Sequence, residues 1–110
     1  MGSSRKDIKT FPEEIRDDFG VGLYYAQLGA IHPDTKPLRG LGSGILEIVA
    51  DDRSGTYRAV YTIALGNFVY VLHCFQKKSK SGIKTSQRDI DLINSRLKEA
   101  KEDFRKRGGK

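Results

Sequence analysis

The feature that most constrains the fold is a pair of β-forming runs separated by only two residues. Residues 57–65 and 68–75 are rich in β-branched and aromatic side chains, and only Gly66-Asn67 lies between them. So short a connection joins antiparallel neighbours, because parallel strands need a crossover of a dozen or more residues. Residues 45–49 form a similar run ahead of a turn at residues 51–55. The sequence therefore predicts an antiparallel meander of three or four strands.

The segment before this meander is predicted to be helical. Thr10 can cap a helix, and apolar residues then recur at helical spacing, namely Phe11, Ile15, Phe19 and Leu23. Gly20 and Gly22 each weaken a helix by roughly 1 kcal/mol relative to Ala. They indicate either a break or a place where another element packs closely. We expect a break, with a second helix over residues 21–28, followed by loops at residues 32–37 and 40–44.

One long helix is predicted in the C-terminal third. Ser86 can cap it, with Asp89 three positions later. An apolar stripe then follows at three- and four-residue spacing, formed by Ile90, Ile93, Leu97, Ala100 and Phe104. The expected architecture is a single α+β domain over residues 1–110, with two N-terminal helices and one C-terminal helix packed on a small antiparallel sheet. We expect residues 1–9 and 106–110 to be flexible.

The positive charge is concentrated towards the C-terminus. The 110-residue chain has a net charge of +6. Residues 73–110 carry twelve Lys and Arg against five Asp and Glu, whereas residues 1–72 carry eight against nine. This asymmetry favours a phosphate-rich partner such as nucleic acid. The alternative is a solvated helix with a basic tail.

Other classes of protein are disfavoured by what the sequence lacks. Cys74 is the one cysteine and lies in an apolar run, which fits a small hydrophobic residue in a reducing compartment. The two histidines and this cysteine lack metal-ligand spacing, so we expect no metal and no cofactor. No run of residues is apolar and long enough to span a bilayer, and no signal peptide is visible. The expected location is the cytoplasm, without membrane contact.

A cationic cluster is predicted where the last strand ends. Pairing across Gly66-Asn67 places Arg58 opposite Phe75, close to Lys77 and Lys78. Arginine offers a permanent fork of donors for phosphate oxygens, and a lysine among other cations can serve in proton transfer. Such a cluster suits RNA cleavage by attack of a ribose 2′-hydroxyl on the adjacent phosphate. The alternative is that Arg58 pairs with Glu47 or Asp52 and the lysines are exposed to solvent.

Four segments together resemble the RelE/HigB superfamily of bacterial toxins, in particular its phage-derived HigB-like branch. The segments are Leu38-Arg39-Gly40-Leu41-Gly42, Gly44-Ile45-Leu46-Glu47, Tyr57-Arg58-Ala59-Val60-Tyr61 and Leu72-His73-Cys74-Phe75-Gln76-Lys77-Lys78-Ser79. The sequence departs from the pattern at Val49, where this branch often has arginine, and in the last helix, which lacks the tyrosine that some RelE-type members carry.

The resemblance implies a ribosome-dependent mRNA endonuclease that needs no metal and is neutralised by an antitoxin, typically a helix-turn-helix protein. Arg58 and Lys78 would then be catalytic, with Lys77 assisting. Proton transfer would fall to Glu47, Tyr57 or Tyr61. RNA binding would involve the further cations Arg53, Lys80 and Lys84.

Two other functions remain open from the sequence. The protein could be a non-catalytic module that binds RNA, DNA or a partner protein. It could also be a gyrase-directed toxin, because the ParE branch is similar in fold.

Overall fold

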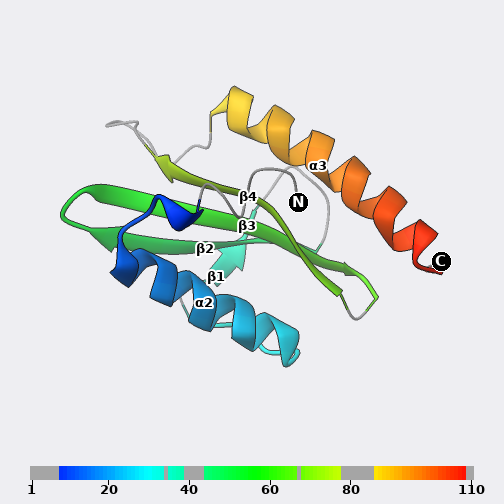
Figure 1. The fold of residues 1–110 in the computed structure, drawn as a ribbon, viewed down its shortest axis with the longest axis horizontal. Helices are drawn as coiled ribbons and strands as arrows, with labels where there is room; N and C mark the ends of the chain where they lie inside the picture. The colour runs from blue at the N-terminus through cyan, green and yellow to red at the C-terminus, as the bar shows by residue number, and fades with distance from the viewer. Residues whose placement is uncertain (1–7, 34, 39–43, 67, 78–85, 109–110) are drawn as a thin grey trace.

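Four antiparallel strands in chain order form the centre of the structure (Figure 1). The structure is a computed structural model that describes residues 8–33, 35–38, 44–66, 68–77 and 86–108. The strands are β1 (Thr35–Pro37), β2 (Ile45–Asp52), β3 (Gly55–Leu65) and β4 (Phe68–Lys77). Leu65 pairs with Phe68, so the two-residue connection between β3 and β4 is confirmed. The predicted α+β class and antiparallel meander are confirmed as well.

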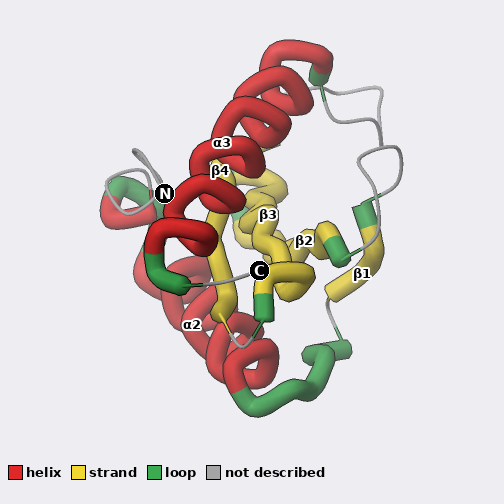
Figure 2. The backbone as a smooth tube through the Cα atoms, turned by 90° about the vertical axis from the view of Figure 1, so that its right-hand side faces the viewer, coloured by secondary structure: helices red, strands yellow, loops and turns green. Residues whose placement is uncertain are grey.

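Two helices cover opposite faces of this sheet (Figures 1 and 2). Helix α2 (Glu13–Gln27) buries Ile15, Phe19 and Ala26 in one core cluster, and helix α3 (Gln87–Lys106) buries Ile93 and Ala100 in another. Side chains alternate between the two faces along each strand, which makes both faces of the central strands apolar. No helix among the described residues is long and apolar enough to cross a membrane.

The prediction of two N-terminal helices in this segment is wrong, because α2 runs unbroken through Gly20 and Gly22. Gly22 is where α2 approaches the sheet most closely: a Cβ atom there would lie 2.6 Å from Ile48 Cδ1. Packing on the sheet therefore outweighs the low helix propensity of glycine. The predicted Thr10 cap is also wrong, because Pro12 occupies the cap position and makes no side-chain hydrogen bond.

Part of the predicted loop at residues 32–37 is instead the edge strand β1. Thr35, Lys36 and Pro37 pair with Ile48, Glu47 and Leu46 of β2. Proline is tolerated on an edge strand, where its missing N–H removes no ladder hydrogen bond. The predicted loop at residues 40–43 lies outside the described residues, as do the chain ends at residues 1–7 and 109–110.

The N-terminal cap of α3 is confirmed. The backbone N–H of Asp89 donates to Ser86 Oγ at 3.2 Å, and Ser86 Oγ donates to Asp89 Oδ2 at 2.7 Å. The first two-residue turn, at Arg53-Ser54, is stabilised by Asp52, which accepts from the Ser54 backbone N–H at 2.7 Å. The turn is shorter than the predicted residues 51–55, because Asp51 and Asp52 continue β2 and Gly55 begins β3.

Candidate functional site

The centre of the candidate site is a buried ion pair between β2 and β3. Arg58 Nη1 donates to both carboxylate oxygens of Glu47, at 2.9 Å each. Glu47 is 3% exposed and Arg58 is 5% exposed. Lys36 on the edge strand adds a weaker contact, with its Nζ 4.0 Å from Glu47 Oε1. The pairing of Arg58 with Glu47, one of the two alternatives left open by the sequence, is therefore what the structure contains.

Arg58 is nevertheless incompletely bonded. Its Nε is buried and has no hydrogen-bond partner among the described residues. An unsatisfied buried donor costs about 1–3 kcal/mol. A group that accepts from Nε would therefore gain a pre-oriented donor, because Glu47 already fixes the guanidinium.

The strand register brings the predicted neighbours of Arg58 to the same end of the sheet. Arg58 lies opposite Phe75, as predicted, and Lys77 lies opposite Thr56. The basic chain therefore leaves β4 two residues beyond Phe75. Lys78, Lys80 and Lys84 lie outside the described residues.

Other predicted site residues are not brought to Arg58. Tyr57 and Tyr61 belong to the core cluster under α2, on the opposite face of the sheet. The Tyr57 hydroxyl lies 2.5 Å from Ser54 Oγ, and the Tyr57 ring packs against Phe11. Burial raises the pKa of Tyr61, with a smaller opposing influence from the Thr35 hydroxyl. Neither tyrosine is placed for proton transfer at Arg58.

Arg53 is exposed in the turn between β2 and β3. It lines a surface hollow together with Asp52, Glu13 and Glu14 from the start of α2. Its described surroundings are therefore acidic. Among the described residues, no hydrogen bond or ion pair joins Arg53 to the Glu47–Arg58 pair.

A second polar network, which the sequence analysis missed, lies beside Arg58 on the α3 face. His73 Nε2 lies 2.8 Å from Asp89 Oδ1, and Arg96 Nη1 lies 3.2 Å from His73 Nδ1. Because a guanidinium only donates, Nδ1 accepts and the ring proton sits on Nε2, where it is donated to Asp89. The His73 ring also stacks on Phe75, with ring centroids 4.7 Å apart. Arg58 and the network therefore share Phe75 as a common neighbour.

An irregularity in the sheet makes this network possible. Val60 pairs with His73 but Tyr61 pairs with Val71, so Leu72 has no partner residue in β3. Arg96 donates to the Leu72 carbonyl oxygen at 3.0 Å. In the sequence, Arg96 follows Ile93 by three positions and therefore lies on the same side of α3 as the apolar stripe. A charged residue on that side indicated a buried polar contact.

The site offers hydrogen-bond donors and a paired carboxylate, but no recognisable metal centre. No group of three His, Cys, Asp or Glu side chains among the described residues could hold a metal ion. What the described atoms provide is a fixed guanidinium with a spare donor on β3, paired with the end of β4, which leads into a basic run. Because Arg58 is only 5% exposed, a phosphate oxygen would reach this donor only after a movement that uncovers the guanidinium.

Residues 6–98 match the family described as Phage derived protein Gp49-like (DUF891). Neither a curated protein nor a solved structure matches the chain. The matched region includes α2, all four strands and more than half of α3. Because the match spans most of its length, the chain belongs to the phage-derived Gp49-like family, which is related to the proteins of toxin–antitoxin systems.

Proposed function

We propose that this protein is the toxin of a type II toxin–antitoxin system and cleaves mRNA on the ribosome without a metal ion. Membership of the Gp49-like family supports the first part. The similarity of residues 57–61 and 72–79 to RelE and HigB toxins supports the second. The observation that carries the proposal is the guanidinium of Arg58, which is fixed by Glu47, has an unpartnered Nε among the described residues, and lies beside the strand that leads into Lys77.

In the proposed reaction, the ribose 2′ oxygen bonds to phosphorus and the bond from phosphorus to the 5′ oxygen breaks. The products are a cyclic phosphate and a free 5′-hydroxyl, so one proton leaves the 2′-hydroxyl and one reaches the 5′ oxygen. Arg58 and Lys78 would stabilise the charge on the phosphorane oxygens. Lys77 would assist, because a lysine among other cations releases its proton more readily.

Glu47 is better assigned to positioning Arg58 than to proton transfer. Both of its oxygens accept hydrogen bonds from Arg58 Nη1, and its side chain is almost fully buried. A general base has to reach the substrate hydroxyl within hydrogen-bond distance. Lys80, Lys84 and Arg53 would contribute general attraction to RNA, which falls steeply as salt is added.

The test is induced expression in bacteria, with mapping of new 5′ ends on translated messages. We expect Lys78→Ala to abolish growth arrest and cleavage. Lys98→Ala, which removes the same charge from the exposed side of α3, should leave both unchanged. Undiminished cleavage by the double variant Lys77→Ala/Lys78→Ala would overturn the proposed mechanism.

A second candidate function is binding without catalysis. The observation that favours it is that Glu47 neutralises the charge of Arg58 inside the protein. A purified protein that binds RNA with a steep salt dependence, but never cuts translated mRNA, would establish this alternative.

A further inference from the structure

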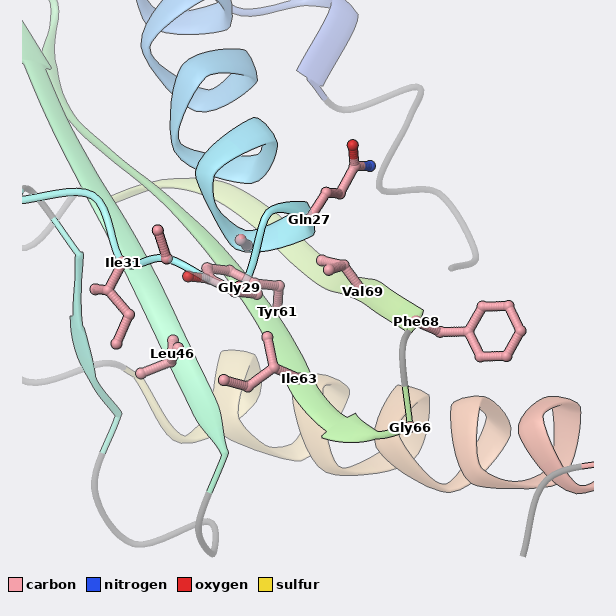
Figure 3. A pocket seen from close by; sticks show the side chains of 11 residues that line it. Gln27, Gly29, Ile31, Leu46, Tyr61, Ile63, Gly66, Phe68 and Val69 are labelled. Atoms are coloured by element: carbon pink, nitrogen blue, oxygen red, sulfur yellow. The ribbon is translucent and has the colours of Figure 1, made fainter.

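An apolar pocket of about 370 Å³ lies between the end of α2 and strands β2, β3 and β4 (Figure 3). Ile31, Leu46 and Ile63 are among its walls, and Tyr61 also lines it. Among the described residues, no charged side chain lines this pocket. A polyanion such as RNA therefore has to bind elsewhere, and the Glu47–Arg58 pair lies on the opposite face of the sheet.

That opposite face, covered in part by α3, carries a third charged side chain beside the pair. Side chains directly opposite one another in paired strands share a face of the sheet. Lys36, Glu47 and Val60 are aligned in this way across β1, β2 and β3, and Val60 packs in the core cluster of α3. Arg58 precedes Val60 by two residues on β3 and is therefore on the same face. Lys36 thus lies at the β1 end of the row that contains the Glu47–Arg58 pair.

Lys36 is the accessible charge of these three residues. Its side chain is 56% exposed, whereas Glu47 and Arg58 are almost fully buried. Helix α3 packs on β4 and β3, and β1 is at the far edge of the sheet from β4 (Figure 2). An anion can therefore reach Lys36 without displacing the helix and without the movement that uncovers Arg58.

The three side chains together carry one excess positive charge. Glu47 contributes a formal charge of −1, and Arg58 and Lys36 contribute +1 each. Both oxygens of Glu47 accept from Arg58 at 2.9 Å, whereas Lys36 Nζ is 4.0 Å from the nearer oxygen. A contact of that length from an exposed lysine contributes little to stability. The Lys36 ammonium group is therefore available to an anion from outside the protein.

We propose that Lys36 is a phosphate-binding residue of the Arg58 site and contacts the RNA backbone from the β1 side of the sheet. Its ammonium group would bind a phosphate oxygen while Arg58 stays paired with Glu47. Lys36 lies outside the four segments that resemble RelE and HigB toxins. This inference rests on the proposed function in taking RNA as the partner, but it does not depend on cleavage.

The experiment measures binding of a fluorescently labelled single-stranded oligouridylate to the full chain, by anisotropy over a range of salt concentrations. Lys36→Ala should flatten the slope of log K against log salt concentration by about 0.7, because one phosphate contact is lost. Lys36→Arg keeps the charge and should keep the slope. The control Lys9→Ala removes the same charge at an exposed position next to Ile8, which packs on the α2 face, and should change the slope less. Thermal unfolding should be the same in all three variants.

Several results would overturn the inference. Equal slopes in Lys36→Ala and the native chain would do so, as would failure of the native chain to bind the oligomer. Equal flattening by Lys36→Ala and Lys9→Ala would also do so, and so would equal flattening by Lys36→Ala and Lys36→Arg. Cleavage of translated messages is measured separately. A slope that depends on Lys36 in a chain that never cuts mRNA would remove the proposed endonuclease and leave the phosphate-binding residue.

Discussion

At the scale of single residues, the Glu47–Arg58 pair serves stability and the proposed chemistry at once. Removing two charges from water is costly, and their attraction offsets that cost only while both are present. The pair is nearly inaccessible to solvent, yet Arg58 Nε has no partner in the described part of the chain. A substitution of Arg58 alone therefore tests folding as much as function.

We predict that Arg58→Met lowers the free energy of unfolding by about 3–5 kcal/mol, because it leaves the Glu47 carboxylate buried without its partner. The double variant Glu47→Gln/Arg58→Met should recover much of that loss. Urea unfolding of the single and double variants measures the coupling. Equal stabilities of Arg58→Met and the native chain would contradict the description of this pair as buried and mutually dependent.

At the scale of elements, α2 and α3 attach to the sheet by different means. Helix α2 lies flat on the sheet because Gly22 allows close contact with Ile48. Helix α3 is attached by polar bonds at both ends, through His73 and Asp89 near its start and Tyr70 and Asp103 near its end. Overpacking should therefore disturb the packing of α2 on the sheet, whereas pH should act on the bond between Tyr70 and Asp103 near the end of α3.

Gly22→Ala and Gly20→Ala should change stability in opposite directions. A Cβ atom at Gly22 would meet three Ile48 atoms at 2.6–3.4 Å, whereas one at Gly20 would meet nothing within 4 Å. We expect Gly22→Ala to destabilise by about 1–3 kcal/mol and Gly20→Ala to stabilise by up to about 1 kcal/mol. Thermal unfolding of the two variants provides the comparison. Stabilisation by both would mean that α2 does not need this close approach.

The end of α3 should respond to pH through Tyr70 and Asp103. The Tyr70 hydroxyl donates to Asp103 Oδ2 at 2.8 Å. The pKa of Asp103 is lowered from 3.8, chiefly by this bond, and the pKa of Tyr70 is raised from 10.0, chiefly by burial and then by Asp103. A carboxyl group whose pKa is lowered by folding stabilises the fold at pH values above its pKa in the unfolded chain. That stabilisation is lost as the pH falls through its pKa in the folded chain. A tyrosine whose pKa is raised by folding stabilises the fold below pH 10.0, and that stabilisation is lost as the pH rises through its pKa in the folded chain.

Tyr70→Phe should therefore be less stable than the native chain at neutral pH, and the difference should shrink at both extremes. The Asp103 pKa, followed by NMR titration, should rise towards 3.8 in this variant. An unchanged Asp103 pKa would mean that the bond to Tyr70 is not what lowers it.

At the scale of the whole molecule, charge and apolar surface are segregated. The basic residues are concentrated after residue 73, whereas the exposed apolar side chains gather around the end of α2 and the connection between β3 and β4. The sheet lies between Arg58, on the face covered by α3, and the exposed apolar side chains of α2.

Binding to single-stranded RNA should weaken as salt is added, because each contact with a phosphate releases counterions. Removing two phosphate contacts in Lys77→Ala/Lys78→Ala should flatten the slope of log K against log salt concentration by about 1.4. The matched control Lys98→Ala/Lys101→Ala removes the same charge from exposed positions on α3 and should change the slope less. Fluorescence anisotropy over a range of salt concentrations measures both. Equal slopes in the two variants would show that the basic residues after β4 have no special role.

The sequence by itself determined the antiparallel meander, the start of α3 and the pairing of Arg58 with Phe75 in register. The turn and the cap depend on residues close together in the chain: a two-residue turn joins β3 and β4 with Leu65 opposite Phe68, and Ser86 caps the helix that follows it. The pairing of Arg58 with Phe75 agrees with that turn because the register shifts between Leu65 and Thr62 and between Tyr61 and Val60 offset each other. Local chemistry is sufficient for such features, because the interacting groups are neighbours in any conformation.

Only the tertiary structure decided the rest. It joined two predicted helices into α2, made β1 an edge strand, chose Glu47 over Asp52 as the partner of Arg58, and brought Arg96 to His73. It also created the pocket beside Tyr61. Each of these outcomes depends on groups that meet only when distant segments pack, and that packing can outweigh local preferences of about 1 kcal/mol such as that of Gly22 against helix.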